Sequence, residues 1–496
     1  MKRCRLPLLL LALLLLLPAS AAPAGEHRPN LVLIFTDGQR SDAVGYSGNH
    51  AVSTPHLDAL AREALILENC YVNTSICAVN RANLMAGQYP GRHGIHGFFE
   101  AFDGPRLRAT VPGRLQAAGY QTAFFGKWGI GDSPEQTHAA AEVFDYWAGQ
   151  PMQTCYFHEP DCRYVRFDGF RRPLDDLCDC PADARGKPGF RNRIGVANLR
   201  DPIHTDAEVI PMQVGRFLAG RDPAKPFALF LFFKSPHAPF GDFAPAVAGV
   251  TDGLAMPRPP AATLDAAGRV PPAVKASLGR GTGMMRLRRD GALDRHQRDY
   301  FRLVSSMDRG VGRVVAALGG AGVADRTVTM FTSDSGHFFS EHGLAEAWLM
   351  YEPSLRVPGF VHDPRRPVDA GGRKTTLPVI TTDFSVTLLA YAGLDRPAEM
   401  TGADLRPLFD GTPPAWREDV FYDHPYGQGG SIPRTIGVRT PRFTYTRYTG
   451  TDPLQEELFD NFADPNQRNN LAGVAGHAET LATLRARCDE LRDEVD

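Results

Sequence analysis

The stretch that decides the fold is PNLVLIFTDGQ, residues 29–39. Its apolar run is nearly continuous and ends at a single acidic residue, Asp37. A run of this kind is typical of a parallel strand that is covered by helices on both faces. Ligands of open α/β sheets bind beyond the carboxyl ends of such strands. The stretch therefore predicts an α/β protein with a site close to Asp37.

Three further buried strands are expected along the chain, and helical segments separate them. They are GYQTAFFGKWGIG at 119–131, KPFALFLFFKSPHAPF at 225–240 and RTVTMFTSDSG at 326–336. Helix signals occur in TPHLDALAREAL at 54–65, which opens on Thr-Pro, and in DYFRLVSSMDRGVGRVVAALGGAG at 299–322. This alternation predicts a mixed, mostly parallel central sheet sandwiched by helices.

The last part of the chain has a different pattern. PLFDGTPPAW at 407–416 is rich in turn formers, and TIGVRTPRFTYTRYTG at 435–450 alternates as antiparallel strands do. The end of the chain has a helical pattern. We therefore expect a main domain at 23–412 and a smaller C-terminal α+β subdomain, built on an antiparallel sheet, at 413–496.

The N-terminus has the three parts of a secretory signal. MKRCR is basic, LPLLLLALLLLLP is apolar, and ASAAPA supplies small residues at a cleavage site. We expect residues 1–22 to be removed, which leaves a secreted or periplasmic protein without a membrane span. The chain of 496 residues has a formal net charge of −2, which argues against nucleic acid as a partner.

The cysteines are unevenly distributed. Removal of the signal would leave Cys70, Cys77, Cys155, Cys162, Cys178, Cys180 and Cys488. An odd number in an oxidising compartment leaves at least one cysteine unpaired or used differently. Four of them lie between residues 155 and 180, where a disulfide-stapled loop is favoured over a small zinc site.

One cysteine stands in a distinctive setting. In TSICAVNRANLMAG, residues 74–87, Cys77 lies four residues before Arg81, in a polar turn that leads into a helix. Taken alone, a half-buried thiol or a disulfide with Cys70 is the favoured interpretation of Cys77. The rest of the chain is needed to decide whether this residue is chemical or structural.

Taken in order, the motifs resemble those of the type I sulfatases of the alkaline phosphatase superfamily. They are RPNLVLIFTDGQRSDAVG, TPHLDALAREA, ICAVNRANLMAGQYPGRHG, GYQTAFFGKWGIG, SPHAPF, SSMDRGVGRVVAAL, FTSDSGHFFSEHGL, MYEPSLRVP and ELFDNFADPNQRNNLA. No single motif decides, but the ordered set is highly specific. TSICAVNRA and MYEPSLRVP are most similar to the bacterial group that acts on sulfated amino sugars. The resemblance implies an alkaline phosphatase-like fold and a secreted sulfatase that acts on a sulfated carbohydrate.

In that family a maturation enzyme oxidises a motif cysteine to formylglycine, whose hydrate attacks the sulfur of the ester. A histidine protonates the leaving alcohol, while calcium and several cations hold the sulfate oxygens. By matching position, the resemblance implies that Cys77 is the formylglycine precursor and that Arg81 holds its hydrate. Lys127 would hold a sulfate oxygen or the nucleophile, and His237 would contact the sulfate or its leaving group. The implied calcium ligands are Asp37, Asp334 and the modified Cys77.

Two sets of motif positions depart from the family pattern. Gly38 stands where the family has the second aspartate of the calcium site, and Ser335 follows Asp334. The maturation motif has Val79 in place of proline and Asn80 in place of the common serine. These changes predict weaker calcium binding and less efficient formylglycine formation.

Two donor positions around the sulfate are also missing. A family histidine aligns with Gly129, and a family lysine aligns with Ala347. Loss of one preorganised donor typically lowers a rate by roughly 10²–10³. The side chains that could replace the missing groups in space are His337, His342 and Asp42.

Two other functions fit the same motifs. A degenerate sulfatase fold could bind sulfated glycan or a partner without turnover, and the missing groups motivate this alternative. A related phosphoesterase is the second alternative, since the superfamily shares its sheet and its metal-binding edge. Sulfate ester hydrolysis, with calcium as cofactor and a maturation enzyme as partner, is the leading hypothesis.

Overall fold

The computed structural model describes residues 28–496 with a number of gaps. The gaps are 132, 151–153, 167, 171–200, 260–269, 285–286, 288–290, 367, 370, 412, 414 and 428–430. The predicted signal at 1–22, together with Cys178 and Cys180 of the predicted stapled loop, lies outside the described residues.

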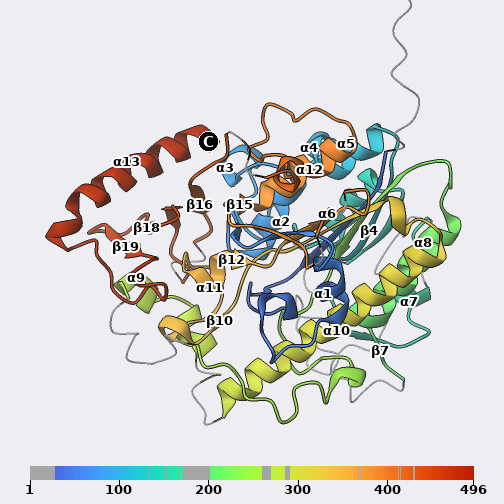
Figure 1. The fold of residues 1–496 in the computed structure, drawn as a ribbon, viewed down its shortest axis with the longest axis horizontal. Helices are drawn as coiled ribbons and strands as arrows, with labels where there is room; N and C mark the ends of the chain where they lie inside the picture. The colour runs from blue at the N-terminus through green and yellow to red at the C-terminus, as the bar shows by residue number, and fades with distance from the viewer. Residues whose placement is uncertain are drawn as a thin grey trace, which may run out of the picture.

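An eight-stranded sheet runs through the middle of the molecule (Figure 1). In spatial order its strands are β14 (Arg373–Thr375), β2 (Leu65–Leu67), β13 (Phe360–His362), β9 (Thr327–Ser333), β1 (Asn30–Thr36), β8 (Phe227–Phe232), β4 (Gln121–Lys127) and β5 (Tyr146–Gln150). The strands from β9 to β5 are parallel, and β13 is antiparallel to both of its neighbours. The predicted mixed, mostly parallel sheet is confirmed.

Helices cover both faces of this sheet (Figure 1). One face carries α2 (Cys77–Ala86), α5 (Val111–Ala117) and α12 (Thr381–Tyr391). The other carries α1 (Pro55–Ala61), α8 (Ile210–Gly220) and α10 (Ala292–Gly320). In β1, Leu31, Leu33 and Phe35 belong to the first core, while Val32 and Ile34 belong to the second. Side chains of a strand alternate between faces, so a strand between two helix layers is apolar throughout.

The polar residues singled out in the sequence follow the carboxyl ends of the central strands. Lys127 is the last residue of β4, while Asp37 and Asp334 come directly after β1 and β9. His237 follows β8 after a short turn. Because these strands are parallel neighbours, their ends lie at one edge of the sheet and bring the four residues into one region.

A second sheet, separate from the first, lies at the C-terminal end of the chain (Figure 1). It is antiparallel, with β16 (Val420–His424), β17 (Thr435–Arg439), β18 (Phe443–Tyr448) and β19 (Gln455–Asp460) in that order. The last helix, α13 (Ala478–Val495), packs Leu481, Leu484 and Cys488 against Val438 and Leu458 of this sheet. The predicted antiparallel sheet and terminal helix are confirmed.

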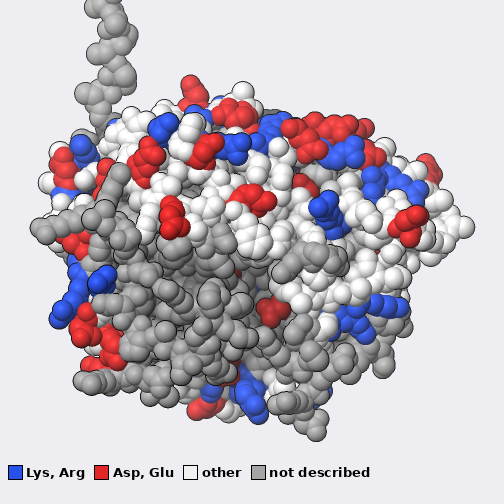
Figure 2. Space-filling model, turned by 180° about the vertical axis from the view of Figure 1, so that it is seen from behind, with Lys and Arg blue, Asp and Glu red and all other residues white. Residues whose placement is uncertain are grey.

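The surface has no dominant charge on the side seen from behind. Figure 2 shows basic and acidic side chains intermixed over the described part of that face. A broad basic patch of the kind that binds nucleic acid is not present on that part. Within the described ranges, no helix is both long enough and apolar enough to cross a membrane.

Candidate active site

Helix α2 begins at Cys77, which lines a cavity at the carboxyl edge of the sheet. Cys77 and Cys70 are free thiols, so the two do not form a disulfide. Burial raises the pKa of Cys77 to about 11, against the opposing charge of Lys127. The unmodified side chain is therefore a neutral thiol near pH 7 and a weak nucleophile.

Four buried charged residues form a cluster next to Cys77. Arg81 Nε donates to Asp334 Oδ2 at 2.9 Å, and Arg81 Nη2 lies 3.3 Å from Asp37 Oδ2. The Lys127 ammonium donates to the same oxygen of Asp37. Arg81 Nη1 also donates to the Lys127 carbonyl at 2.6 Å. Two carboxylates and two cations from distant parts of the chain thus meet in one ion-pair cluster.

The two carboxyl groups of this cluster differ in their protonation behaviour. Burial raises the pKa of Asp37, but the charges of Lys127 and Arg81, and of His237 where it is protonated, outweigh burial and hold that pKa well below its usual value. Burial and the charge of Asp37 raise the pKa of Asp334 to about 6, although Arg81 and Lys127 lower it. The cluster therefore favours the ionised form more strongly at Asp37 than at Asp334.

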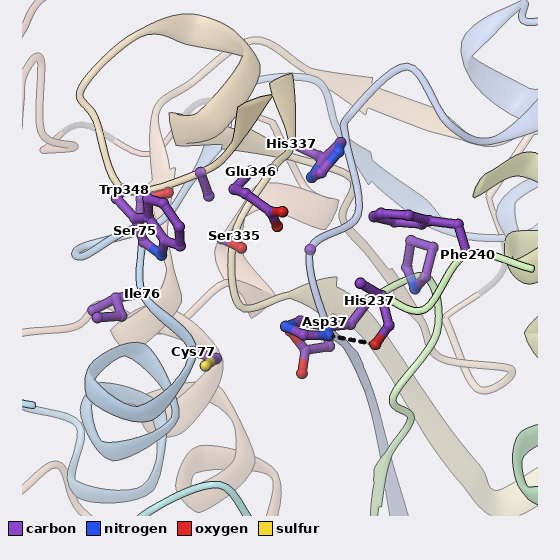
Figure 3. A pocket seen from close by; sticks show the side chains of 15 residues that line it. Asp37, Ser75, Ile76, Cys77, His237, Phe240, Ser335, His337, Glu346 and Trp348 are labelled. Carbon is purple, nitrogen blue, oxygen red and sulfur yellow. Dashed lines mark hydrogen bonds between the residues drawn. The ribbon is translucent and has the colours of Figure 1, made fainter. Parts of the chain in front are cut away.

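Beside the cluster lies an open cavity (Figure 3). Asp37, Cys77 and His237 line one side of it, while His337 and residues 346–348 line the other. The backbone of Glu346 and Trp348 has positive φ, 68° and 78°. Non-glycine residues held in this strained region cluster at functional sites.

His237 is held in a defined tautomer. Its Nδ1 lies 2.9 Å from the Ala238 carbonyl oxygen, which can only accept, so Nδ1 carries the hydrogen. Burial lowers the pKa of His237 to about 4, although the Asp37 charge opposes this shift. The imidazole is therefore neutral near pH 7, and its Nε2 carries no proton.

One side chain of the C-terminal sheet connects the two sides of the cavity. The Tyr422 hydroxyl accepts from the Ser75 backbone N–H at 3.3 Å and donates to the Trp348 carbonyl at 3.3 Å. Both Ser75 and Trp348 line the cavity. The buried Tyr422 therefore fixes the segment that leads to Cys77 against the opposite wall.

Two family models match the chain. The model described as Sulfatase covers residues 29–394, which is more than half of the chain. The chain belongs to the sulfatase family. A second model, described as N-sulphoglucosamine sulphohydrolase, C-terminal, matches residues 340–494 of this sulfatase. The predicted family of sulfuric ester hydrolases is confirmed.

Individual relatives agree with this assignment. The N-acetylglucosamine-6-O-sulfatase of Bacteroides thetaiotaomicron is 26% identical over 550 residues, which cover 98% of this chain and 90% of that protein. A solved complex with D-glucosamine-2-N,6-O-disulfate has a TM-score of 0.74 at 24% identity and covers 95% of this chain and 98% of its own. The phosphonate monoester hydrolase of Agrobacterium radiobacter has a TM-score of 0.69 at 21% identity, with 95% and 96% covered. The predicted alkaline phosphatase-like fold is confirmed.

The two positions where this sulfatase lacks a predicted donor both face the site. A Cβ at Gly129 would lie 3.0 Å from Arg81 Cδ and 3.3 Å from Lys127 Cε. Ala347 lines the cavity directly. No lysine or arginine lines the cavity within the part of the chain that the structure describes. The nearby cations are those of the buried cluster.

Of the three suggested replacements, one reaches the cavity. His337 lines it, but burial and neighbouring His296 lower the pKa of His337 well below its usual value, so it brings no charge at pH 7. His342 stacks on Tyr351 at 4.3 Å between ring centroids and is not among the lining residues. Asp42 forms an ion pair with Arg40 at 2.7 Å. The missing donors are therefore not restored by these side chains.

The calcium ion implied by the motifs finds few ligands here. Calcium takes about 6–8 oxygen ligands. Asp37 and Asp334 offer carboxylates, but Gly38 has no side chain and Ser335 Oγ donates to Asp334 Oδ1 at 3.4 Å. Across the described residues, no three His, Cys, Asp or Glu side chains are arranged to hold a metal ion. The donor set does not fit a calcium ion.

Sequence reasoning missed three residues that line the cavity. Phe240 lies at the end of the SPHAPF motif, and Glu346 and Trp348 flank Ala347. SPHAPF was predicted as a motif for His237 alone, and of residues 346–348 only Ala347 was predicted to matter, as the position of an absent lysine. An aromatic or acidic residue beside a motif position is the signal that could have found them.

Proposed function

We propose that the protein is secreted and hydrolyses sulfate esters of a sulfated carbohydrate, with sulfated amino sugars as the substrate class. The observation that carries this proposal is the placement of Cys77, at the start of α2, in one cavity with His237 and beside the Arg81–Lys127 cations. The names of the N-acetylglucosamine-6-O-sulfatase and of the glucosamine disulfate complex support the amino sugar class.

The nucleophile in this proposal is formylglycine, made from Cys77 by a maturation enzyme. The thiol itself is poorly suited because its pKa is raised to about 11. The aldehyde hydrate of formylglycine would supply two hydroxyl groups, one to attack sulfur and one to expel sulfate and so restore the aldehyde. Peptide dipoles at the start of α2 favour negative charge at this position. Val79 replaces the motif proline, so the conversion itself needs to be measured.

The charged cluster and His237 have separate roles in the reaction. Arg81 and Lys127 supply positive potential where negative charge develops in the transition state. His237 Nε2 would take up the proton that the attacking hydroxyl group loses and pass it to the leaving alcohol. A bound sulfate brings negative charge close to the imidazole and raises its pKa from about 4, which favours the protonated form.

Co-expression with a formylglycine-generating enzyme tests the proposal. Mass spectrometry of the Cys77 peptide measures conversion, and sulfate release is then followed on a panel of sulfated glucosamines. We expect release that Cys77→Ala abolishes. Matched phosphate esters in the same panel separate sulfatase from phosphoesterase activity. A fully converted chain that releases no sulfate from any sugar would contradict the proposal.

A second candidate is a protein that binds sulfated glycan without turnover. It is favoured by the loss of donors at Gly129, beside the charged cluster, and at Ala347, in the cavity lining, where no described residue is a lysine or arginine. This candidate predicts saturable binding of a sulfated glucosamine by a converted chain that leaves the ester intact. Calorimetry and sulfate release on one sample distinguish the two candidates.

A further inference from the structure

We propose that this site takes no resident calcium ion and that the Arg81 guanidinium, with Lys127, supplies the fixed positive charge between Asp37 and Asp334. The proposal shares its site with the proposed function but does not depend on turnover. It extends to whichever of hydrolysis or glycan binding the site performs.

Three of the four carboxylate oxygens of Asp37 and Asp334 are already engaged. Asp37 Oδ2 accepts from Lys127 and lies 3.3 Å from Arg81 Nη2. Asp334 Oδ2 lies 2.8 Å from Arg81 Nη2 and accepts from Nε at 2.9 Å. Asp334 Oδ1 accepts from the Gly38 backbone N–H at 3.0 Å. A calcium ion would have to displace these donors to reach the same oxygens.

The charge of the cluster is balanced without a metal. Asp37 and Asp334 contribute two negative charges, and Arg81 and Lys127 contribute two positive charges. All four residues are at most 1% exposed. A divalent cation placed among them would add buried charge with no carboxylate left to compensate it, which is strongly unfavourable in a dry interior.

The missing ligand at position 38 is not excluded by crowding. A Cβ on Gly38 would meet its nearest atom, the Gly336 carbonyl oxygen, at 4.0 Å. The backbone there has φ +76°, a region that aspartate and asparagine enter more readily than most residues. A carboxylate could therefore be placed beside Asp37 and Asp334 with limited rearrangement.

The test compares three forms of the mature chain after dialysis against chelator. They are the wild type, the double variant Gly38→Asp with Ser335→Asn, and the matched double variant Gly38→Asn with Ser335→Asn. Both variants carry the same backbone strain and similar volume, and only the first adds a carboxylate. Calcium binding is measured by calorimetry, and Tm is measured with calcium and with chelator.

We expect no saturable calcium heat and an unchanged Tm for the wild type. The Gly38→Asp variant should bind at least about 10-fold more tightly than its asparagine match and show a calcium-dependent rise in Tm. Saturable one-site binding to the wild type, or a fall in its Tm on chelation, would overturn the proposal. These readouts are independent of sulfate release, so an inactive enzyme leaves the test intact.

Discussion

The floor and the wall of the cavity differ in which charged groups of the family pattern they retain. The floor is defined here as Asp37, Arg81, Lys127 and Asp334, which form a buried, charge-balanced cluster. The wall is defined as His337 and residues 346–348, whose described side chains bring no lysine or arginine to the cavity. A buried ion-pair cluster holds the ends of β1, β4 and β9 against helix α2 whether or not it touches a ligand. The floor would therefore be retained with or without turnover. The missing charge of the wall bears more directly on whether the protein is active.

The largest expected effect tests the structural role of the floor. Arg81→Met leaves Asp37 and Asp334 buried without their shared partner, and should lower the free energy of unfolding by about 3–5 kcal/mol. Urea unfolding measures this loss. The control is Arg108→Met, which removes an exposed ion pair with Glu142 at 2.8 Å and should change stability by less than about 1 kcal/mol. Equal, small losses in both variants would remove the structural explanation of the floor.

The next effect concerns the support of the wall. Glu457 of β19 accepts hydrogen bonds from Tyr351 at 2.8 Å and from Tyr448 at 2.5 Å, and Tyr351 closely follows the wall segment. Burial raises the pKa of Glu457 from 4.5 to about 7 despite these bonds. Between these two values the folded state holds a proton that the unfolded state has lost, so stability falls as pH rises through this range.

Glu457→Gln should remove this pH dependence. When the pH rises from below 4.5 to above 7, the wild type should lose up to about 3 kcal/mol of stability relative to the variant. Urea unfolding at both pH values measures it, with exposed Glu142→Gln as the control. Parallel pH profiles for wild type and Glu457→Gln would mean that the carboxyl ionises in the fold without penalty.

A smaller effect is expected when charge is returned to the wall. Ala347→Lys places an ammonium in the cavity and should tighten binding of a sulfated glucosamine about 10-fold, or 1.4 kcal/mol. Calorimetry on the chain with unmodified Cys77 measures binding without turnover. Ala347→Met supplies similar length without charge. If the methionine and lysine variants bind equally, the missing charge at Ala347 does not limit affinity.

The smallest effect concerns the other vacated position. Gly129→Ala adds a Cβ at φ +71° and 3.0 Å from Arg81 Cδ. Gly48→Ala is the matched control because Gly48 has φ +91° and no atom within 4 Å of a built Cβ. Both lose stability from backbone strain, and Gly129→Ala should lose about 1 kcal/mol more. Equal shifts in Tm would show that Arg81 relaxes freely.

The fold was readable from the sequence because its central strands carry a local signal. Each is an apolar run that ends at a polar residue, and β1 feeds both cores through alternate positions. The same rule brought Asp37, Lys127 and Asp334 together, since parallel neighbours end at one edge. The family motifs pointed to Gly129, which lies against Arg81 and Lys127, and to Ala347, which lines the cavity.

What surrounds those positions was not readable. His337 and His342 lie close together in sequence, yet one lines the cavity and the other stacks on Tyr351. Their directions are set by an irregular segment with positive φ at Ser340 and His342 and by packing against distant residues. Spacing along the chain carries no information about such turns, so only the structure decides which side chain reaches the ligand.

Tyr422 connects the C-terminal sheet to the cavity. Its hydroxyl joins Ser75 to Trp348, although it belongs to the C-terminal sheet. A fragment that stops before β16 would keep Cys77, every residue of the floor and the direct bond from the Trp348 backbone N–H to the Ser75 carbonyl at 3.1 Å, but it would lose the second link through Tyr422. Truncation at the boundary between the two sheets would therefore remove a contact of the cavity. The C-terminal sheet is a structural component of the site.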